Sequence, residues 1–166
     1  MAIKLTVLVI FAMFFMDPCA HRPRRVELKD VPEDCKIENR RFYVRLSGKL
    51  HNTGEVMCGD APGGRKCDIW LADRNGENQV KASVRMVVRK DDVTRWASVI
   101  IVPQAPADVA APFSVKFEDI LIYDRVGNLK DHTKETIDLS GALVVDSGTQ
   151  VCSLRVMYIE SDTADN

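Results

Sequence analysis

The chain has 166 residues and a formal net charge of −1 at pH 7, with 23 basic and 24 acidic residues interspersed along it. Because the charges balance, the protein has no strong positive potential that would attract nucleic acid or anionic lipid, and the sequence disfavours both classes of partner. The length suffices for one domain with a working hydrophobic core and leaves no room for a second.

The N-terminus predicts export. Lys4 precedes a hydrophobic run over residues 5–15, LTVLVIFAMFF, and a run of this length fits a signal peptide, whereas a membrane-spanning helix needs about 20 apolar residues. Ala20 is a small residue suited to cleavage. We therefore expect a signal peptide over residues 1–20, a secreted mature chain that begins near His21, and no membrane span after cleavage. An uncleaved N-terminal anchor is the alternative.

A basic segment follows the expected cleavage site. Residues 21–25 read HRPRR, and Arg22, Arg24 and Arg25 match the R-x-R-R pattern that secretory-pathway convertases cut. The alternative is a solvated basic tail. We favour the tail, because a propeptide of a few residues would have little to do, and we expect residues 21–41 to form a basic N-terminal extension.

Four cysteines remain after the expected cleavage, because Cys19 lies at or before the cut: Cys35, Cys58, Cys67 and Cys152. An even number in an exported chain indicates two disulfides. Three pairings are possible, and the sequence does not choose among them. Cys58 and Cys67 bracket a Gly-rich loop that could close on itself, in which case Cys35 would pair with Cys152. A zinc site is the competing interpretation, but the cysteines lack the short spacing of zinc knuckles.

The first strands follow the basic extension. Residues 42–50, FYVRLSGKL, alternate with period two and predict a half-buried strand. Residues 51–66 are rich in Gly, Asn, Asp and Pro and are predicted as a loop with at most a short strand around Val56. Residues 67–73 form the second strand, and Asn75–Gly76 predicts a two-residue type I′ hairpin turn after it.

The rest of the chain continues this pattern and contains no convincing amphipathic helix. Prolines make residues 103–112 a loop, and alternation in the last strand places Leu154 and Tyr158 on one face. Further strand signals lie at residues 80–88, 95–102, 113–124, the end of 128–140, 142–146 and 151–160.

Seven or eight short strands predict an all-β fold, an antiparallel β-sandwich of the transthyretin-like or immunoglobulin-like type. The sandwich would occupy residues 42–160, followed by a disordered tail at residues 161–166.

No catalytic or cofactor motif is present, so we expect a protein that is not an enzyme and has no cofactor. The mature chain offers His21, His51 and His132 as bases, all in polar segments where solvent-facing side chains are expected. No G-x-S-x-G elbow positions a serine. A small secreted hydrolase is the alternative, and it would require His51 or His132 within hydrogen-bond reach of a Ser, Asp or Cys.

Acidic residues near the strand ends could bind calcium if they met at one end of the sandwich. None has the spacing of a calcium-binding loop, so we interpret them as solvated turn residues and expect no metal. The candidates are Asp60, Asp73, Asp91, Asp92, Glu118 and Asp119.

The two tryptophans lie on predicted strands. Trp70 is on the opposite face of its strand from Ile69, so both a core position and an exposed aromatic binding face are allowed for it, as they are for Trp96. We favour the core.

Residues 44–76 resemble the opening of the nematode transthyretin-like secreted proteins. The shared pattern is an alternating strand, a cysteine, a proline, a second apolar strand that ends in an acidic residue, and an N-G turn. Its residues are Gly48, Leu50, Cys58, Pro62, Ile69, Leu71, Asp73, Asn75 and Gly76. The resemblance implies an extracellular transthyretin-like sandwich used for binding rather than catalysis, without a hormone site.

The leading interpretation is a secreted, non-enzymatic β-sandwich that binds an extracellular protein, a lipid or a small apolar ligand. A lipid-carrying sandwich with its ligand between splayed sheets and an immunoglobulin-like recognition domain are the alternatives within binding. The sequence does not determine the ligand or the oligomeric state.

Overall fold

The computed structural model describes residues 23–36, 43–87, 98–102, 110–145 and 150–161. These residues are mostly β-strand, as predicted. They form eleven strands rather than seven or eight, because segments predicted as loops or turns also pair. The strands are β1 (Arg24–Arg25), β2 (Tyr43–Leu50), β3 (Glu55–Ala61), β4 (Gly64–Ala72), β5 (Gln79–Val87), β6 (Val99–Ile101), β7 (Phe113–Lys116), β8 (Leu121–Tyr123), β9 (Leu129–Lys130), β10 (Ile137–Val145) and β11 (Cys152–Ile159).

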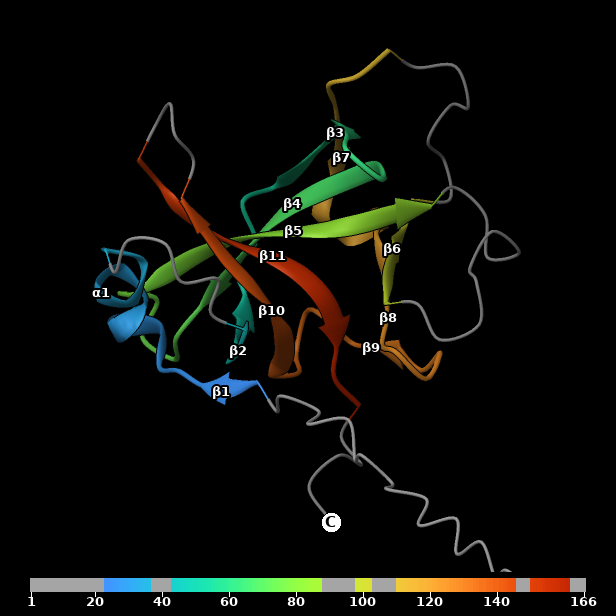
Figure 1. Cartoon of the computed structure of the whole chain (residues 1–166). Helices are drawn as coiled ribbons and strands as arrows, with labels where there is room; N and C mark the ends of the chain where they lie inside the picture. Colours follow the sequence, from blue (N-terminus) through green and yellow to red (C-terminus); the bar gives the residue numbers. More distant parts are fainter. Residues whose placement is uncertain (1–22, 37–42, 88–97, 103–109, 146–149, 162–166) are drawn as a thin grey trace, which may run out of the picture.

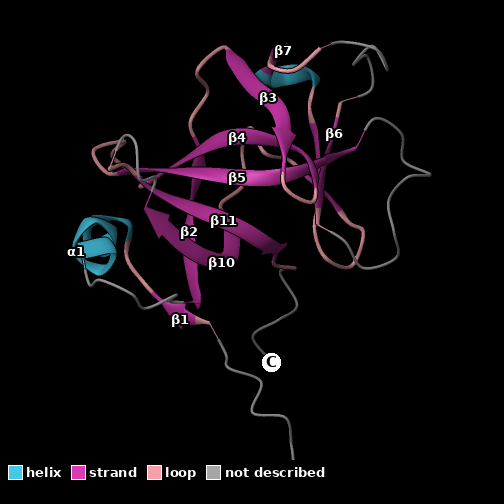
Figure 2. Ribbon diagram, turned by 45° about the horizontal axis from the view of Figure 1, so that its top comes forward, coloured by secondary structure: helices cyan, strands magenta, loops and turns pink. Residues whose placement is uncertain are grey.

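Five of the strands close into a ring. β2 pairs with β4, β4 with β5, β5 with β11, β11 with β10, and β10 with β2. Every pair is antiparallel except β5–β11, and Figures 1 and 2 both show β11 between β5 and β10. Numbered along the chain, the ring runs 1-2-3-5-4-1, the order of the five-stranded Greek-key barrels of the OB type. The sheet therefore closes on itself, in place of the two facing sheets that were expected.

Apolar side chains fill the interior of this barrel. The alternation predicted for residues 42–50 and 80–88 is confirmed where these residues are described, since every second side chain is buried. The inward side chains that are at most 2% exposed include Val44, Leu46, Ile69, Leu71, Ala82, Val84, Leu139 and Leu154. The centre of the barrel is thus a packed core.

Apart from β1, which pairs with β2, the remaining strands extend the ring on two sides. β3 and β7 continue the sheet outward from β4. β6 pairs with Met86 and Val87 at the end of β5, and β8 and β9 follow it. Figure 1 shows β6, β8 and β9 together on the right-hand side of the molecule.

Residues 51–66, predicted as a loop, instead contain most of a hairpin. Residues 57–61 of β3 pair with residues 64–68 of β4, and Gly63 and Gly64 turn the chain with φ values of 88° and 115°. Glycine adopts these values without steric cost, so the glycine-rich composition reflects a tight turn between two strands. Cys58 lies directly opposite Cys67 in this hairpin, and the two form a disulfide with Cα atoms 4.0 Å apart.

The β4–β5 hairpin forms, but not with the predicted turn. A type I′ turn needs positive φ at both central residues, whereas Gly76 has φ 75° and Asn75 is not in that region. The loop is wider, and the N–H of Asp73 donates to the carbonyl of Asn78 at 3.1 Å. The Asp73 carboxylate accepts the N–H groups of Asn75 and Glu77, which stabilises this wider loop.

A β-bulge changes which face of the sheet the side chains of β11 occupy. β10 runs unbroken through Gly141, where two separate strands were expected. Ser140 pairs with Tyr158, but the next residue pairs two positions earlier in β11, which leaves Met157 as the extra residue. The alternation reverses there. Tyr158 is 38% exposed, so the prediction that it shares the face of Leu154 is wrong.

The N-terminal segment packs onto the barrel, although residues 21–41 were expected to be an extension. A 3-10 turn, η1 (Leu28–Asp30), and a helix, α1 (Val31–Lys36), place Leu28 and Val31 in the core, at 5% and 1% exposure. A disulfide joins Cys35 of α1 to Cys152 of β11. The sequence did not reveal α1, because six residues are too few to show a helical period.

Several predictions concern residues outside the described ranges. They are the signal peptide over residues 1–20, Arg22, Trp96, and all but the first residue of the tail at 161–166. That first residue, Ser161, is 5% exposed and belongs to the folded part. Among the helices of the described residues, none has the length and apolarity needed to cross a membrane.

Candidate functional site

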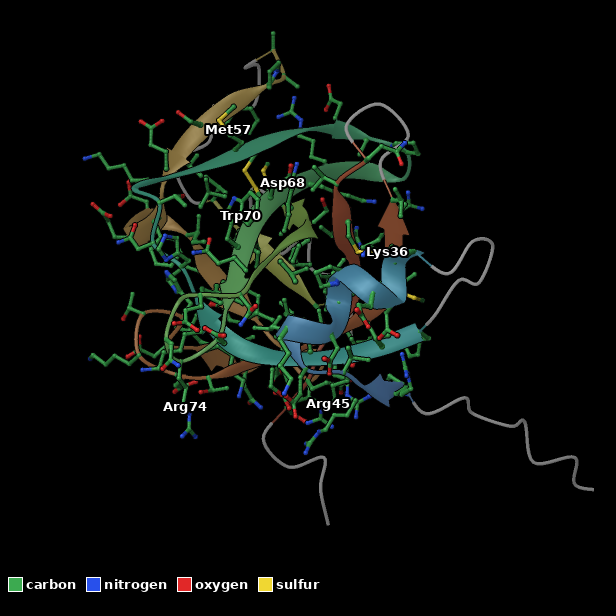
Figure 3. All side chains as sticks on the ribbon, turned by 90° about the vertical axis from the view of Figure 1, so that its left-hand side faces the viewer. Lys36, Arg45, Met57, Asp68, Trp70 and Arg74 are labelled. Atoms are coloured by element: carbon green, nitrogen blue, oxygen red, sulfur yellow. A yellow bond between two sulfur atoms is a disulfide. The ribbon has the colours of Figure 1, made fainter. Side chains whose placement is uncertain are left out.

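A surface groove of about 560 Å³ lies at one rim of the barrel. The N-terminal segment forms one wall, the β4–β5 loop forms the other, and β2 lies between them. We call this the rim groove, and its lining consists of residues 25–29, residues 47–49, Asp73, Arg74, Asn78 and Thr136. In Figure 3 the N-terminal segment runs past β2, and Arg74 lies at the end of the β4–β5 hairpin.

The floor of the rim groove is a gap in the pairing of β2. β1 pairs with β2 only as far as Arg25 opposite Arg45, and β4 joins the same edge from Lys49 onward. Ser47 lies between them. The register would place Glu27 of the N-terminal segment, or Arg74 of the β4 side, opposite Ser47, but both chains turn away first. In the described strands neither neighbour pairs with the backbone of Ser47 on this edge.

Gly48 lets the floor lie close to the neighbouring strand. A Cβ atom at Gly48 would lie 2.5 Å from the carbonyl oxygen of Ala72 and 2.9 Å from Cγ of Leu71. It would also lie 3.1 Å from Cδ1 of Leu28, which reaches the core from the N-terminal segment. Only a residue without a side chain fits here, so the floor is backbone.

Basic side chains outnumber acidic side chains in the rim groove. Four basic residues and two acidic residues line it, and the acidic residues already have partners. Glu27 pairs with Lys29 at 2.6 Å. The described part of the chain offers no ion pair to Lys49 or Arg74, both of which are exposed. An anionic ligand would therefore meet two cations that form no ion pair with the carboxylates of the described chain.

Asp73 is the second acidic residue, and its carboxylate is held within the hairpin loop. Asn78 Nδ2 donates to Oδ2 at 2.6 Å, and the N–H groups of Asn75 and Glu77 donate to Oδ1. These hydrogen bonds, that of the Asn78 side chain first, lower the pKa of Asp73. The carboxylate stays ionised at neutral pH and fixes the wall that carries Arg74.

The candidate processing site borders the rim groove. Arg24 and Arg25 form the short strand β1 and are both exposed. Arg24 pairs with Asp34 of α1 at 2.6 Å, and Arg25 lines the groove. The structure therefore ties these residues to the barrel, whereas a free basic tail was expected.

Two of the three candidate histidines, His51 and His132, lie in the described residues and occupy different surroundings, whereas His21 lies outside these residues. His51 is exposed after β2, as expected. His132 is only 8% exposed, so the prediction that it faces solvent is wrong. Its Nε2 lies 3.1 Å from the carbonyl oxygen of Phe117, and its ring packs edge-on against the Phe117 ring with 4.9 Å between centroids. His132 therefore has a structural role that polar neighbours in sequence did not reveal.

The acidic candidates do not converge. Asp60 pairs with Arg65 at 3.2 Å, and Glu118 and Asp119 lie exposed on a separate turn, η3 (Phe117–Asp119). Asp73 belongs to its own loop, and Asp91 and Asp92 are outside the described ranges. The described residues contain no group of three or more His, Cys, Asp or Glu side chains that could hold a metal ion.

Trp70 lies on the outer face of the barrel, so the expectation that it belongs to the core is wrong. It is half-buried on β4 and lies opposite Lys81 of β5. Beside it, the carboxylate of Asp68 pairs with Lys81 at 2.7 Å and accepts a hydrogen bond from Ser83. Figure 3 shows Trp70, Asp68 and Met57 on this side of the molecule. We call this surface the β4–β5 face.

Sequence reasoning missed the rim groove altogether. Lys49 was one of several polar residues on an alternating strand, and Arg74 was a residue beside a turn. The available signal was Gly48 inside an alternating strand, since such a glycine marks a close approach of backbone. No family model, no curated protein and no solved structure matches this chain.

Proposed function

We propose that this protein is an exported, non-enzymatic binding domain that binds an extracellular protein through the rim groove. The observation that carries the proposal is the groove itself, a cavity of about 560 Å³ with Lys49 and Arg74 exposed beside a backbone floor. Its volume lies within the usual range of ligand sites, about 300 to 1,000 Å³. Its charged walls suit a segment of polypeptide better than an apolar molecule.

The packing of the barrel favours a protein over a lipid. A lipid-carrying sandwich would need an apolar space between its sheets, whereas the barrel interior is occupied by side chains such as Leu46, Leu71 and Leu154, all at 0% exposure. A ligand at the rim groove would contact the surface only. The alternative of a lipid carrier is therefore the weaker proposal.

Export and the absence of catalysis are parts of the same proposal. Two disulfides favour an oxidising compartment. His132 packs against Phe117 and His51 is exposed, which disfavours the hydrolase alternative. The resemblance of residues 44–76 to the nematode transthyretin-like proteins also implies extracellular binding, and it stays a prediction on which the proposal does not depend.

The β4–β5 face supports a second candidate function, the binding of an oligosaccharide. β4 and β5 are the second and third strands of the ring, and this face binds oligonucleotides and oligosaccharides in OB-type barrels. The half-buried Trp70 beside the Asp68–Lys81 pair offers an aromatic surface next to hydrogen-bonding groups. A chain without a basic excess favours the sugar over the oligonucleotide.

Site-specific photo-crosslinking in extracellular extract of the source tests both candidates. A photoreactive residue would replace the exposed Thr136 in the rim groove, Lys81 on the β4–β5 face, or Glu118 on η3 as the matched surface control. We expect protein adducts at position 136 that are absent at position 118. Adducts at neither 136 nor 81, or equal adducts at all three positions, would contradict the proposed function, and a glycan array checks the second candidate directly.

A further inference from the structure

The structure shows more about the rim groove than its charge, because the gap in β2 is a vacant place in a sheet. Along the edge of β2 that faces the groove, the N–H of Val26 donates to the carbonyl of Arg45, and the N–H of His51 donates to the carbonyl of Trp70. On the β2 side, the groups in these bonds belong to Arg45 and His51. Every second residue of a strand directs its N–H and C=O groups to the same edge, so those of Ser47 also point toward the groove.

An unpaired strand edge is a template for another extended chain. The N-terminal segment leaves β2 at η1, and β4 leaves it at the Asp73 loop. The side chain of Ser47 is already engaged by Asp138, which keeps it on the outer face of the sheet. A short extended peptide could therefore reach the backbone of Ser47 without displacing a strand.

The side chains around this edge select the charge of that peptide. Lys49 is two residues along β2 from Ser47 and so lies on the same face. Arg74 is the residue that the β2–β4 register would place opposite Ser47. Both are exposed, and neither has an ion-pair partner within the described ranges.

We propose that the rim groove binds an extended acidic peptide segment of its partner, which pairs with the backbone of Ser47 and places carboxylates near Lys49 and Arg74. This inference rests on the proposed function and names the chemistry of the partner. A sulfated glycan is the competing polyanion. The groove favours the peptide, because the unpaired backbone of Ser47 offers hydrogen bonds to an extended polypeptide, whereas a glycan makes no use of a strand edge.

The test uses the full disulfide-bonded protein and three fluorescent probes of equal length. These are an alternating Glu/Val peptide, the corresponding Lys/Val peptide, and the Glu/Val peptide with one central N-methylated amide; a heparin-derived oligosaccharide is the fourth probe. We expect binding of the Glu/Val peptide alone among the unmodified probes, with a shift of the Ser47 amide in NMR spectra. N-methylation should weaken binding about tenfold through the loss of a backbone hydrogen bond.

Variants of the protein separate recognition from folding. Charge reversal at both cations, Lys49→Glu with Arg74→Glu, should weaken the Glu/Val peptide about tenfold or more, and reversal at the exposed Arg85 should leave it unchanged. The neutral pair Lys49→Gln with Arg74→Gln should weaken it less, and far-UV circular dichroism checks the fold of each variant.

Two outcomes would overturn the inference. One is preferential binding of the oligosaccharide, and the other is equal binding of the acidic peptide with and without N-methylation. If crosslinks still form at position 136, either outcome removes the acidic extended peptide as the ligand and leaves the binding role of the groove intact. Failure of both experiments would remove the groove as a binding site.

Discussion

At the scale of single residues, Gly48 connects the stability of the barrel to the rim groove. The carbonyl of Ala72 and the side chains of Leu71 and Leu28 occupy the space where a Cβ atom would lie. Two of these three contacts belong to β4, and the third anchors the N-terminal wall. The same residue therefore sets the distance between β2 and β4 and the shape of the floor.

The substitution Gly48→Ala tests this role. A methyl group 2.5 Å from a backbone oxygen forces the strands apart, so we expect a loss of about 1 to 3 kcal/mol in the free energy of unfolding, measured with urea. Gly59→Ala is the matched control, because its Cβ would meet only Pro112, at 3.9 Å. Equal stability of the Gly48 variant and wild type would contradict a close approach of Gly48 to β4.

At the scale of elements, the sequence predicted strands best where one face is buried. The alternation of residues 42–50 and 80–88 reports directly on the packed interior of the barrel. Elements shaped by hydrogen bonds or by a bulge were missed, including the Asp73 loop and the extra residue Met157. These depend on contacts between segments, which no local pattern encodes. The rim groove has the same cause, since it exists only where three separate segments meet.

The β4–β5 loop should respond to acid. Because hydrogen bonds lower the folded pKa of Asp73 below the ordinary value of 3.8, its ionised form stabilises the loop above that value, and this contribution is lost as the pH falls through the lower folded pKa. We expect the amide resonances of Asn75 and Glu77 to shift together in that range. In Asp73→Asn, which keeps an acceptor without the charge, the shared shift should vanish. Persistence of the shift in the variant would assign it to another group.

At the scale of the whole molecule, the two disulfides constrain very different lengths of chain. Cys35 and Cys152 are 117 residues apart in sequence, whereas Cys58 and Cys67 are nine residues apart within one hairpin. Of the three pairings that the sequence left open, the structure has the one with the largest difference in loop length. The long link holds α1, and with it one wall of the rim groove, against the barrel.

Removal of each disulfide should therefore have a different effect. By loop entropy, Cys35→Ser with Cys152→Ser should lower the free energy of unfolding by about 4 to 5 kcal/mol, and Cys58→Ser with Cys67→Ser by about 2 to 3 kcal/mol. Urea unfolding of both double variants measures the difference. A larger loss from the hairpin pair would show that local strand pairing, rather than chain entropy, determines what each bond contributes.

Because β11 lies between β5 and β10, it also determines when the barrel can close during synthesis. Of the described strands, β11 (residues 152–159) is synthesised last, and the two strands that pair with it come earlier. Until β11 emerges, the nascent chain has a gap in the barrel with two unpaired strand edges, those of β5 and β10. Unpaired strand edges can pair with other chains and cause aggregation. Under the proposed export, the chain crosses a membrane before it folds, and the gap then closes in an oxidising compartment where the Cys35–Cys152 disulfide fixes β11 to α1.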